Sequence, residues 1–209
     1  MTGDPQKFPC LLLAGGQSRR MGGGAKFLKK LGSKTLLMHI IDVLRPQVGE
    51  FALNMNMEAH GDVPSDIPVI KDSVSGFAGP LAGILTGMEY FNKKNVHSSH
   101  MLSVPTDAPF IPSNLVTRLA SEIEGTTSKI VMANSVGRVH PVVALWPLSL
   151  AADLRAVLVK EDLRKILVFA NRYPRSEVIW DESEGDPFFN INRPEDLAEA
   201  ERRLSHSPT

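Results

Sequence analysis

The sequence has only one cysteine, no excess of charge of either sign and no apolar run long enough to span a bilayer. Cys10 alone excludes an internal disulfide and a cysteine-rich metal site, which fits a reducing compartment. The HSSH run at 97–100 has no cysteine or acid at ligand spacing, so a solvated loop is expected there. Lys and Arg number 23 and Asp and Glu also number 23, which argues against whole-surface attraction to nucleic acid or anionic lipid. Any anion-binding site must therefore be local.

The length and composition predict one domain, and we expect no targeting signal. The apolar run that follows MTGDPQKF is too short for a secretion signal, so we expect a cytoplasmic protein with no membrane partner. With 209 residues, of which 43% are hydrophobic, the chain is long enough to bury a full core. We expect the domain to cover residues 7–204, with flexible tails at 1–6 and 205–209.

Short apolar runs alternate with stretches of helical periodicity. A strand buried on both faces is expected from Phe8 through FPCLLLAGG, and further strands at 51–55, 69–70, 101–104, 129–133, 142–146, 178–179 and 188–191. Helices are expected at 33–45, 79–91, 112–123, 149–159, 162–170 and 193–204. This alternation predicts an α/β fold with a doubly wound, mostly parallel sheet. Such a sheet places its site beyond the carboxyl ends of its strands.

The loop after the first strand is rich in glycine and basic residues, within LLLAGGQSRRMGGGAKF at 11–27. Gly15 and Gly16 allow the backbone to turn sharply and bring N–H groups close to an anion. Arg20 and Lys26 carry charges that would neutralise a polyphosphate. The alternative is a surface loop that is glycine-rich and basic without a ligand.

Two better-known glycine loops do not fit this segment. A Walker A loop needs Gly-Lys-Ser/Thr, but Lys26 is preceded by Ala25 and followed by Phe27. The dinucleotide fingerprint needs G-x-G-x-x-G opening a helix directly after the strand, and that spacing is absent. The loop therefore indicates phosphate binding of a different type.

The pattern L-A-G-G-x-S-x-R-M-G-x(3)-K resembles the signature of the glycosyltransferase-A-like nucleotidyltransferases. Its LAGG spelling resembles the molybdenum cofactor guanylyltransferase branch, and further blocks in the same order extend the resemblance over roughly residues 8–204. The resemblance implies a Rossmann-like fold of the nucleotide-diphospho-sugar transferase type. It also implies nucleotide contacts along the motif, at Leu13, Ala14, Gly15, Gly16 and Lys26.

Two blocks resemble the family's nucleotide pocket. In FALNMN, Asn54 corresponds to an asparagine that contacts the nucleotide, although an asparagine also commonly ends a strand. In VIKDSVSGFAGPLAGI, the resemblance implies that Asp72 contacts the nucleotide and that Gly79, Pro80 and Gly83 shape the pocket. Asp72 could otherwise serve as a turn cap.

Asp107, in LSVPTDAPFIP, is the strongest single candidate for chemistry. It follows an apolar strand and lies between Pro105 and Pro109, which restrict the backbone and help to aim the carboxylate. By resemblance Asp107 contacts the nucleotide and binds Mg²⁺, an ion usually held by one or two carboxylates plus substrate phosphates. The alternative is a loop aspartate ahead of a helix that starts at Pro112.

The last two blocks resemble the family's acceptor side. His140 in GRVHPVVALW and the pair Asn190 and Asn192 in FFNINRPEDL are the implied acceptor-binding residues. A lone histidine is more often buried and satisfied by hydrogen bonds. Asn192 and Glu195 also fit an ordinary capping box for the last helix, which makes Asn190 the stronger functional candidate of the two asparagines.

The resemblance implies that the terminal phosphate of molybdopterin attacks Mg·GTP and releases pyrophosphate, with Lys26, Arg20 and Asp107 as the catalytic residues. It also implies transient contact with proteins that handle the molybdenum cofactor. Ala25 and Arg193 depart from the family pattern, which usually has an acid and a threonine there. A cytidylyltransferase, a sugar-1-phosphate nucleotidyltransferase and a non-catalytic GTP- or cofactor-binding module remain alternatives.

Overall fold

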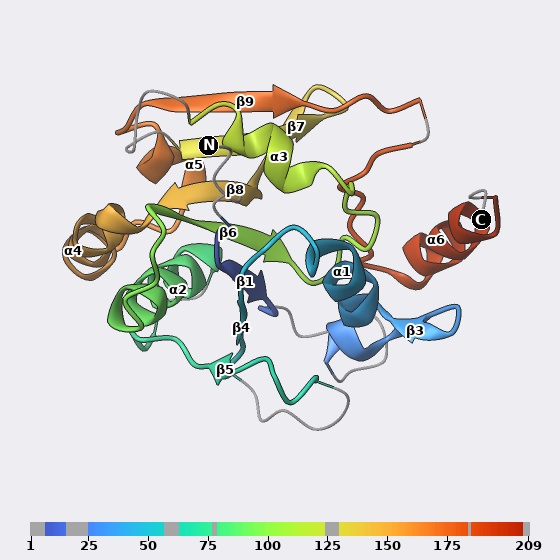
Figure 1. Ribbon diagram of the computed structural model, residues 1–209, viewed down its shortest axis with the longest axis horizontal. Helices are drawn as coiled ribbons and strands as arrows, with labels where there is room; N and C mark the ends of the chain where they lie inside the picture. The colour runs from blue at the N-terminus through green and yellow to red at the C-terminus, as the bar shows by residue number, and fades with distance from the viewer. Residues whose placement is uncertain are drawn as a thin grey trace, which may run out of the picture.

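A seven-stranded sheet forms the centre of the computed structural model, which describes residues 7–15, 25–56, 63–76, 79–123, 130–183 and 185–206. The strand order is β5-β4-β1-β6-β8-β7-β9 (Figure 1). Only β8 runs antiparallel to its neighbours, so the expected mostly parallel α/β sheet is confirmed. The strands are β1 (Cys10–Leu13), β4 (Phe51–Asn54), β5 (Val69–Ile70), β6 (His100–Pro105), β7 (Ile130–Ser135), β8 (Arg138–Pro147) and β9 (Arg175–Ile179).

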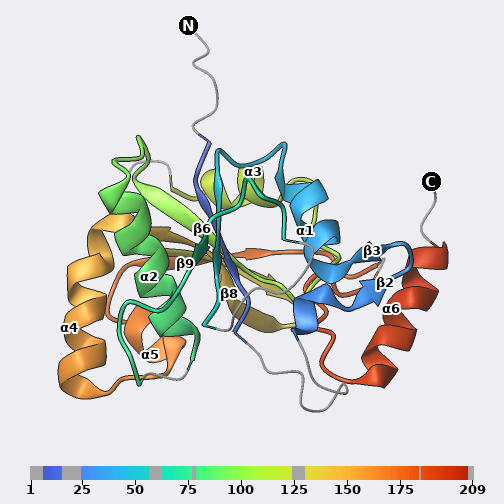
Figure 2. The same cartoon turned by 90° about the horizontal axis from the view of Figure 1, so that it is seen from below.

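Helices cover both faces of the sheet, as expected for a doubly wound fold (Figure 2). On one face lie α1 (Leu36–Leu44) and α3 (Leu115–Ala120), and on the other α2 (Pro80–Lys93), α4 (Ala151–Glu161) and α5 (Ile166–Ala170). No helix within the described ranges is long and apolar enough to cross a membrane.

The strand β1 shows why its sequence is apolar throughout. Cys10 and Leu12 pack into the cluster with α1 and α3, whereas Leu11 and Leu13 pack into the cluster with α2 and α4. Alternate side chains thus point to opposite, fully covered faces. Burial raises the pKa of the Cys10 thiol far above its ordinary value, so this cysteine stays protonated and inert.

A short hairpin interrupts the first βα connection and was not expected. β2 (Lys30–Leu31) pairs antiparallel with β3 (Lys34–Thr35), and α1 begins only after Thr35, whose hydroxyl accepts a hydrogen bond from the Met38 N–H at 3.2 Å. The last helix, α6 (Pro194–His206), contacts β2. It extends two residues beyond the expected end at 204.

The strand expected at 188–191 is absent, because its apolar residues belong to two different clusters. Phe188 packs into the main core, whereas Ile191 packs with Leu31 and Leu36 beside α6. The N–H groups of Phe188 and Ile191 donate to Asp186 and Asp107, both outside any strand. Apolar residues in an extended segment therefore indicated burial, but not sheet pairing.

Other differences concern boundaries and one histidine. β8 begins four residues before the expected start at 142, and α3 begins three residues after Pro112, which is in the preceding turn. Two short 3-10 helices, Lys26–Leu28 and Leu148–Leu150, were also not expected. His100 is fully buried at the start of β6 and pairs with the Ser99 hydroxyl at 2.8 Å, so the expected solvated loop is wrong at that residue.

Candidate functional site

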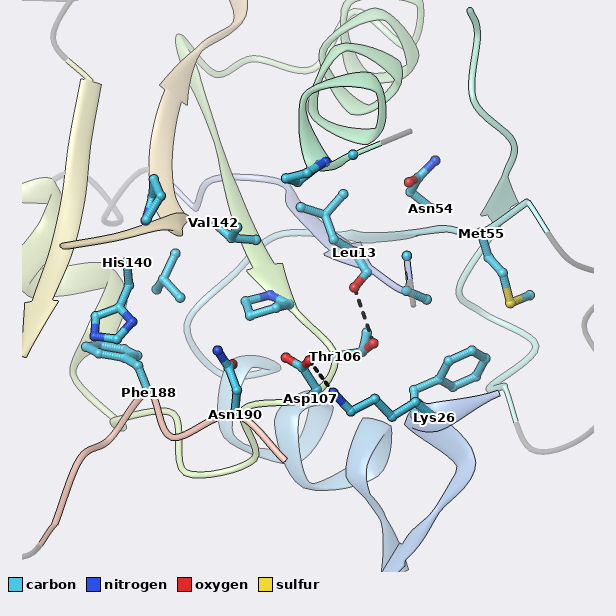
Figure 3. A pocket seen from close by; sticks show the side chains of 18 of the residues that line it. Leu13, Lys26, Asn54, Met55, Thr106, Asp107, His140, Val142, Phe188 and Asn190 are labelled. Atoms are coloured by element: carbon cyan, nitrogen blue, oxygen red, sulfur yellow. Dashed lines mark hydrogen bonds and ion pairs between the residues drawn. The ribbon is translucent and has the colours of Figure 1, made fainter. Parts of the chain in front are cut away.

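A cavity of about 590 Å³ opens at the carboxyl ends of β1, β4 and β6. Because β8 is antiparallel, its first residues reach the same edge of the sheet. Asn54 lies on one side and His140 and Asn190 lie on the other, with Asp107 between them (Figure 3). Asp72, Gly79 and Lys26 also line the cavity, and Asp72 is hydrogen-bonded to Asn54. The cavity therefore lies beyond the strand ends, where the site is predicted.

Lys26 and Asp107 both line this cavity and form an ion pair. The Lys26 Nζ lies 2.7 Å from Asp107 Oδ2 and donates a second hydrogen bond to Asn192 Oδ1 at 2.6 Å. The two charged side chains are 12% and 25% exposed, so solvent screens the pair less than an ordinary surface pair. The Lys26 ammonium group is thus held at the strand ends, with the Asp107 carboxylate as its counter-charge.

Backbone hydrogen bonds set the position of Asp107. The preceding residue, Thr106, donates from both its N–H and its hydroxyl to the Leu13 carbonyl oxygen, each at 3.2 Å. The Ile191 N–H donates to the Asp107 carbonyl oxygen at 2.9 Å. These bonds bring the first strand, the Asp107 loop and the N-x-N segment into one fixed unit.

The capping-box interpretation of Asn192 and Glu195 is wrong. The Asp196 carboxylate accepts from the N–H groups of Asn192 and Arg193, at 2.7 and 2.8 Å, and so caps the start of α6. The Asn192 side chain points instead to Lys26. Asn190 lines the cavity.

Asp72 is held by two asparagines on the side of the cavity where nucleotide contacts were predicted. Asn54 Nδ2 donates to Asp72 Oδ1 at 2.9 Å, and Asn56 Nδ2 donates to Asp72 Oδ2 at 2.7 Å. The Asp72 N–H donates back to Asn56 Oδ1 at 2.9 Å. The carboxylate is oriented, and since each oxygen has two lone pairs it retains capacity for a ligand.

The helix α2 packs very closely against Asn54 and Leu13, and a glycine in the helix makes this close packing possible. A Cβ built on Gly83 would lie 2.4 Å from Asn54 Oδ1 and 2.5 Å from Leu13 Cδ2. Gly79 precedes the helix with φ +130°, a conformation that side chains rarely adopt. Gly79 thus lines the cavity and Gly83 lets α2 approach Asn54, while their predicted part in nucleotide binding stays a prediction.

The opposite side of the cavity carries a buried histidine. His140 is 8% exposed, contacts the Phe188 ring at a centroid distance of 5.0 Å, and lies within 2.8 Å of the Ser135 hydroxyl through its Nε2. Burial lowers the pKa of His140 below its ordinary value, Asp186 opposes this change, and Arg138 adds to it. The ring is therefore neutral at pH 7.

The donor atoms around Asp107 suit a hard cation. The Asp107 carboxylate and Asn192 Oδ1 both contact Lys26 Nζ, and Asn190 lines the same cavity. Oxygen is the donor that Mg²⁺ prefers. Within the described ranges no group of three or more His, Cys, Asp or Glu residues could hold a metal. A metal at this place would thus need oxygen atoms from a substrate as further ligands.

The structure brings together predicted residues from every motif block. Arg20 and Gly16 lie outside the described residues, so their roles stay predictions. Sequence reasoning missed Ser135, Asp186 and Asn56, whose hydrogen bonds orient predicted site residues. Each of these three residues is close in the sequence to a predicted site residue, but none of them belongs to a motif position that indicates a function.

The fold and site define the class of protein. A solved structure entitled molybdopterin-guanine dinucleotide biosynthesis protein A, from Archaeoglobus fulgidus, has the same fold with a TM-score of 0.74, at 24% identity and covering 96% of this chain and 100% of that one. The 2-C-methyl-D-erythritol 4-phosphate cytidylyltransferase of Thermus thermophilus also shares it, with a TM-score of 0.67, 20% identity, and 94% and 98% coverage. The chain thus has the α/β fold of nucleotidyltransferases.

Sequence comparison narrows the class to a family. The family model described as MobA-like NTP transferase domain matches residues 10–175. The molybdenum cofactor guanylyltransferase of Rhodopseudomonas palustris (strain HaA2) is 45% identical over 205 residues, which cover 98% of this chain and 96% of that protein. The chain belongs to the MobA-like NTP transferase family, and the expected family is confirmed.

Proposed function

We propose that this chain transfers the GMP moiety of GTP to molybdopterin, with release of pyrophosphate. The observation that carries the proposal is the contact of Lys26 with Asp107, both of which line the cavity, and the hydrogen bond from Lys26 to Asn192 that adds to it. The 45% identity to a protein named molybdenum cofactor guanylyltransferase supports the same reaction.

The nucleotide side, with Asn54 and Asp72, suits guanine. Guanine presents adjacent N–H donors, N1–H and the 2-amino group, on one edge, and a carboxylate accepts such a pair in a bidentate manner. Asp72 supplies that carboxylate, held in place by Asn54 and Asn56. Cytosine lacks the adjacent donor pair, so the oriented Asp72 favours GTP over CTP.

Charge placement accounts for catalysis at the centre of the site. The terminal phosphate of molybdopterin is already an anion at neutral pH, so no strong general base is needed to activate it. Lys26 places a positive charge where the triphosphate would lie, and Asn192 and Asp107 hold its ammonium group in position. Asp107 would hold Mg²⁺ together with the substrate phosphates. Bound there, Mg²⁺ would neutralise the charge that develops on the phosphate oxygens.

The acceptor would lie on the other side of the cavity, against His140 and Asn190. In-line attack requires that acceptor and leaving pyrophosphate approach the α-phosphorus from opposite directions. We assign Leu13, Ala14 and Gly15 to the nucleotide, because they line the same cavity beside Lys26.

The test is Mg²⁺-dependent pyrophosphate release by the purified protein with molybdopterin and each of GTP, CTP, ATP and UTP in parallel. Release with GTP alone supports the proposal. A preference for CTP would assign a cytidylyltransferase, and GTP binding without release from any nucleotide would assign a non-catalytic module. A sugar 1-phosphate as acceptor provides the comparison for the remaining alternative.

We also propose a cytoplasmic location and transient contact with proteins that supply molybdopterin or take the product. The chemistry supports this, since the acceptor must be made and the dinucleotide must be used by other proteins. Cell fractionation tests the location, and cross-linking in the presence and absence of molybdopterin tests the contacts.

A further inference from the structure

A chain of hydrogen bonds runs behind the acceptor side of the cavity. The Ser135 hydroxyl donates to Asp186 Oδ1 at 2.6 Å and lies 2.8 Å from His140 Nε2. The hydroxyl has one proton, which the carboxylate accepts, so His140 must donate from Nε2 to the Ser135 oxygen. The chain therefore fixes both the tautomer and the orientation of the His140 ring.

Asp186 also holds the segment that carries Asn190. Its Oδ1 accepts from the Phe188 N–H at 2.9 Å, and its carbonyl oxygen accepts from Arg203 Nη1 at 3.3 Å. The Phe188 ring in turn packs against His140, and both line the cavity (Figure 3). The Asp186 carboxylate thus connects the β7–β8 hairpin to the 185–190 loop, and the Asp186 carbonyl oxygen connects that loop to α6.

The charges around His140 agree with this arrangement. Asp186 and Arg138 are the charged groups that act on the ring, in opposite directions, and burial keeps the ring neutral. Its neutral form fits the geometry, because a neutral imidazole with its proton on Nε2 completes the chain to Asp186 without an additional charge.

We propose that Ser135 and Asp186 are positioning residues for the acceptor: they hold His140 and the Phe188–Asn190 segment in the arrangement that binds it. This inference rests on the proposed function. Neither residue lines the cavity, so each acts through its hydrogen-bonded neighbours. The nucleotide side, with Asn54 and Asp72, has its own separate hydrogen bonds and should not respond.

The test compares the KM for molybdopterin and the KM for GTP in the wild type and in Ser135→Ala, Asp186→Ala and Asp186→Asn. Asparagine retains an Oδ1 acceptor for Ser135 and Phe188, so Asp186→Asn should stay near wild type. The matched control is Ser99→Ala, because Ser99 also pairs with a buried histidine, His100, but at the amino end of β6.

The alanine variants at 135 and 186 should raise the KM for molybdopterin by about tenfold, the effect of losing one or two positioned hydrogen bonds. The KM for GTP and kcat at saturating acceptor should stay near wild type. In NMR spectra the Nε2-protonated tautomer of His140 should dominate in the wild type and lose that preference in Ser135→Ala. If Ser135→Ala does not fold, the comparison of Asp186→Ala with Asp186→Asn tests the positioning role.

An unchanged KM for molybdopterin, or a parallel rise in the KM for GTP, overturns the inference. If the wild type transfers no nucleotide, the proposed function is wrong, and equilibrium binding of molybdopterin then decides the inference separately. Weaker binding to Ser135→Ala than to the wild type and to Ser99→Ala supports it. Equal affinities, or no binding to any of them, overturn it.

Discussion

The Lys26 ammonium group lies 2.7 Å from the Asp107 carboxylate, although the two residues are 81 positions apart in the sequence. Asn192 completes the contact from 166 positions away. Three segments that are distant in the sequence therefore meet at the Lys26 ammonium group, which is held in place without a substrate. Preorganised charge of this kind contributes to catalysis because no rearrangement is needed at the moment of reaction.

Lys26→Ala should lower kcat by about 10² to 10³, the usual effect of removing one preorganised charge contact. Initial rates of pyrophosphate release with GTP and molybdopterin measure the change. Lys34→Ala is the matched control. Lys34 Nζ lies 2.5 Å from Asp42 Oδ2 in an exposed ion pair, and neither residue lines the cavity. If Lys26→Ala releases pyrophosphate at the wild-type rate, the contact between Lys26 and Asp107 has only a structural role.

Asp107→Asn should leave the loop in place but remove the negative charge that a metal ion needs. We expect turnover to fall on the order of a hundredfold or more, since charge stabilisation at the phosphates is lost. Titration of pyrophosphate release with Mg²⁺ measures the effect, with Asp42→Asn as the control. An unaltered Mg²⁺ dependence in Asp107→Asn contradicts the metal assignment.

The strands β1, β4, β6 and β7 could be predicted because they are buried and mostly apolar. The β2–β3 hairpin could not, since its strands have two residues each and leave no periodic pattern. The reversed direction of β8 also has no local signal. It follows from pairing with β6 and β7, which tertiary packing decides.

Some residues of the candidate site could likewise be predicted from the sequence, and others could not. Lys26, Asp107, Asn54 and Asp72 were predicted through their motifs, which keep chemistry-bearing residues at fixed spacing. The hydrogen bond between Ser135 and Asp186 joins two segments that are 51 positions apart, and no spacing in the sequence indicates that they meet. Even Asn192 was open to two interpretations until the structure placed Asp196 at the helix start.

Gly83→Ala should raise the KM for GTP, because the added Cβ would lie 2.4 Å from Asn54 Oδ1 and force that side chain to move. The displaced amide could no longer hold Asp72 at 2.9 Å. Overpacking should also lower the free energy of unfolding by about 1–3 kcal/mol. Steady-state kinetics and chemical unfolding measure the two effects.

Gly87→Ala is the matched control, one helical turn along α2. Its added Cβ would lie 2.6 Å from Leu11 Cδ2, so it should cause a similar loss of stability. Leu11 does not line the cavity, and the KM for GTP should therefore stay near wild type. Equal changes in KM for the two variants would mean that the effect is general destabilisation.

His140 should make the stability of the protein depend on pH. Because burial lowers its pKa, the folded protein takes up this proton less readily than the unfolded chain does. Above the ordinary imidazole pKa of about 6.5 both states are neutral, and the group has no effect on stability. As the pH falls below that value, the unfolded chain is protonated first, so the free energy of unfolding decreases.

Chemical unfolding of the wild type and of His140→Gln, from about pH 8 to about pH 5, measures this contribution. Glutamine donates a hydrogen bond to Ser135 through its amide but does not titrate. The stability advantage of the wild type over His140→Gln should therefore shrink as the pH falls. A constant difference across the range would mean that His140 takes up its proton equally in both states, in conflict with a buried neutral ring linked to Asp186 through Ser135.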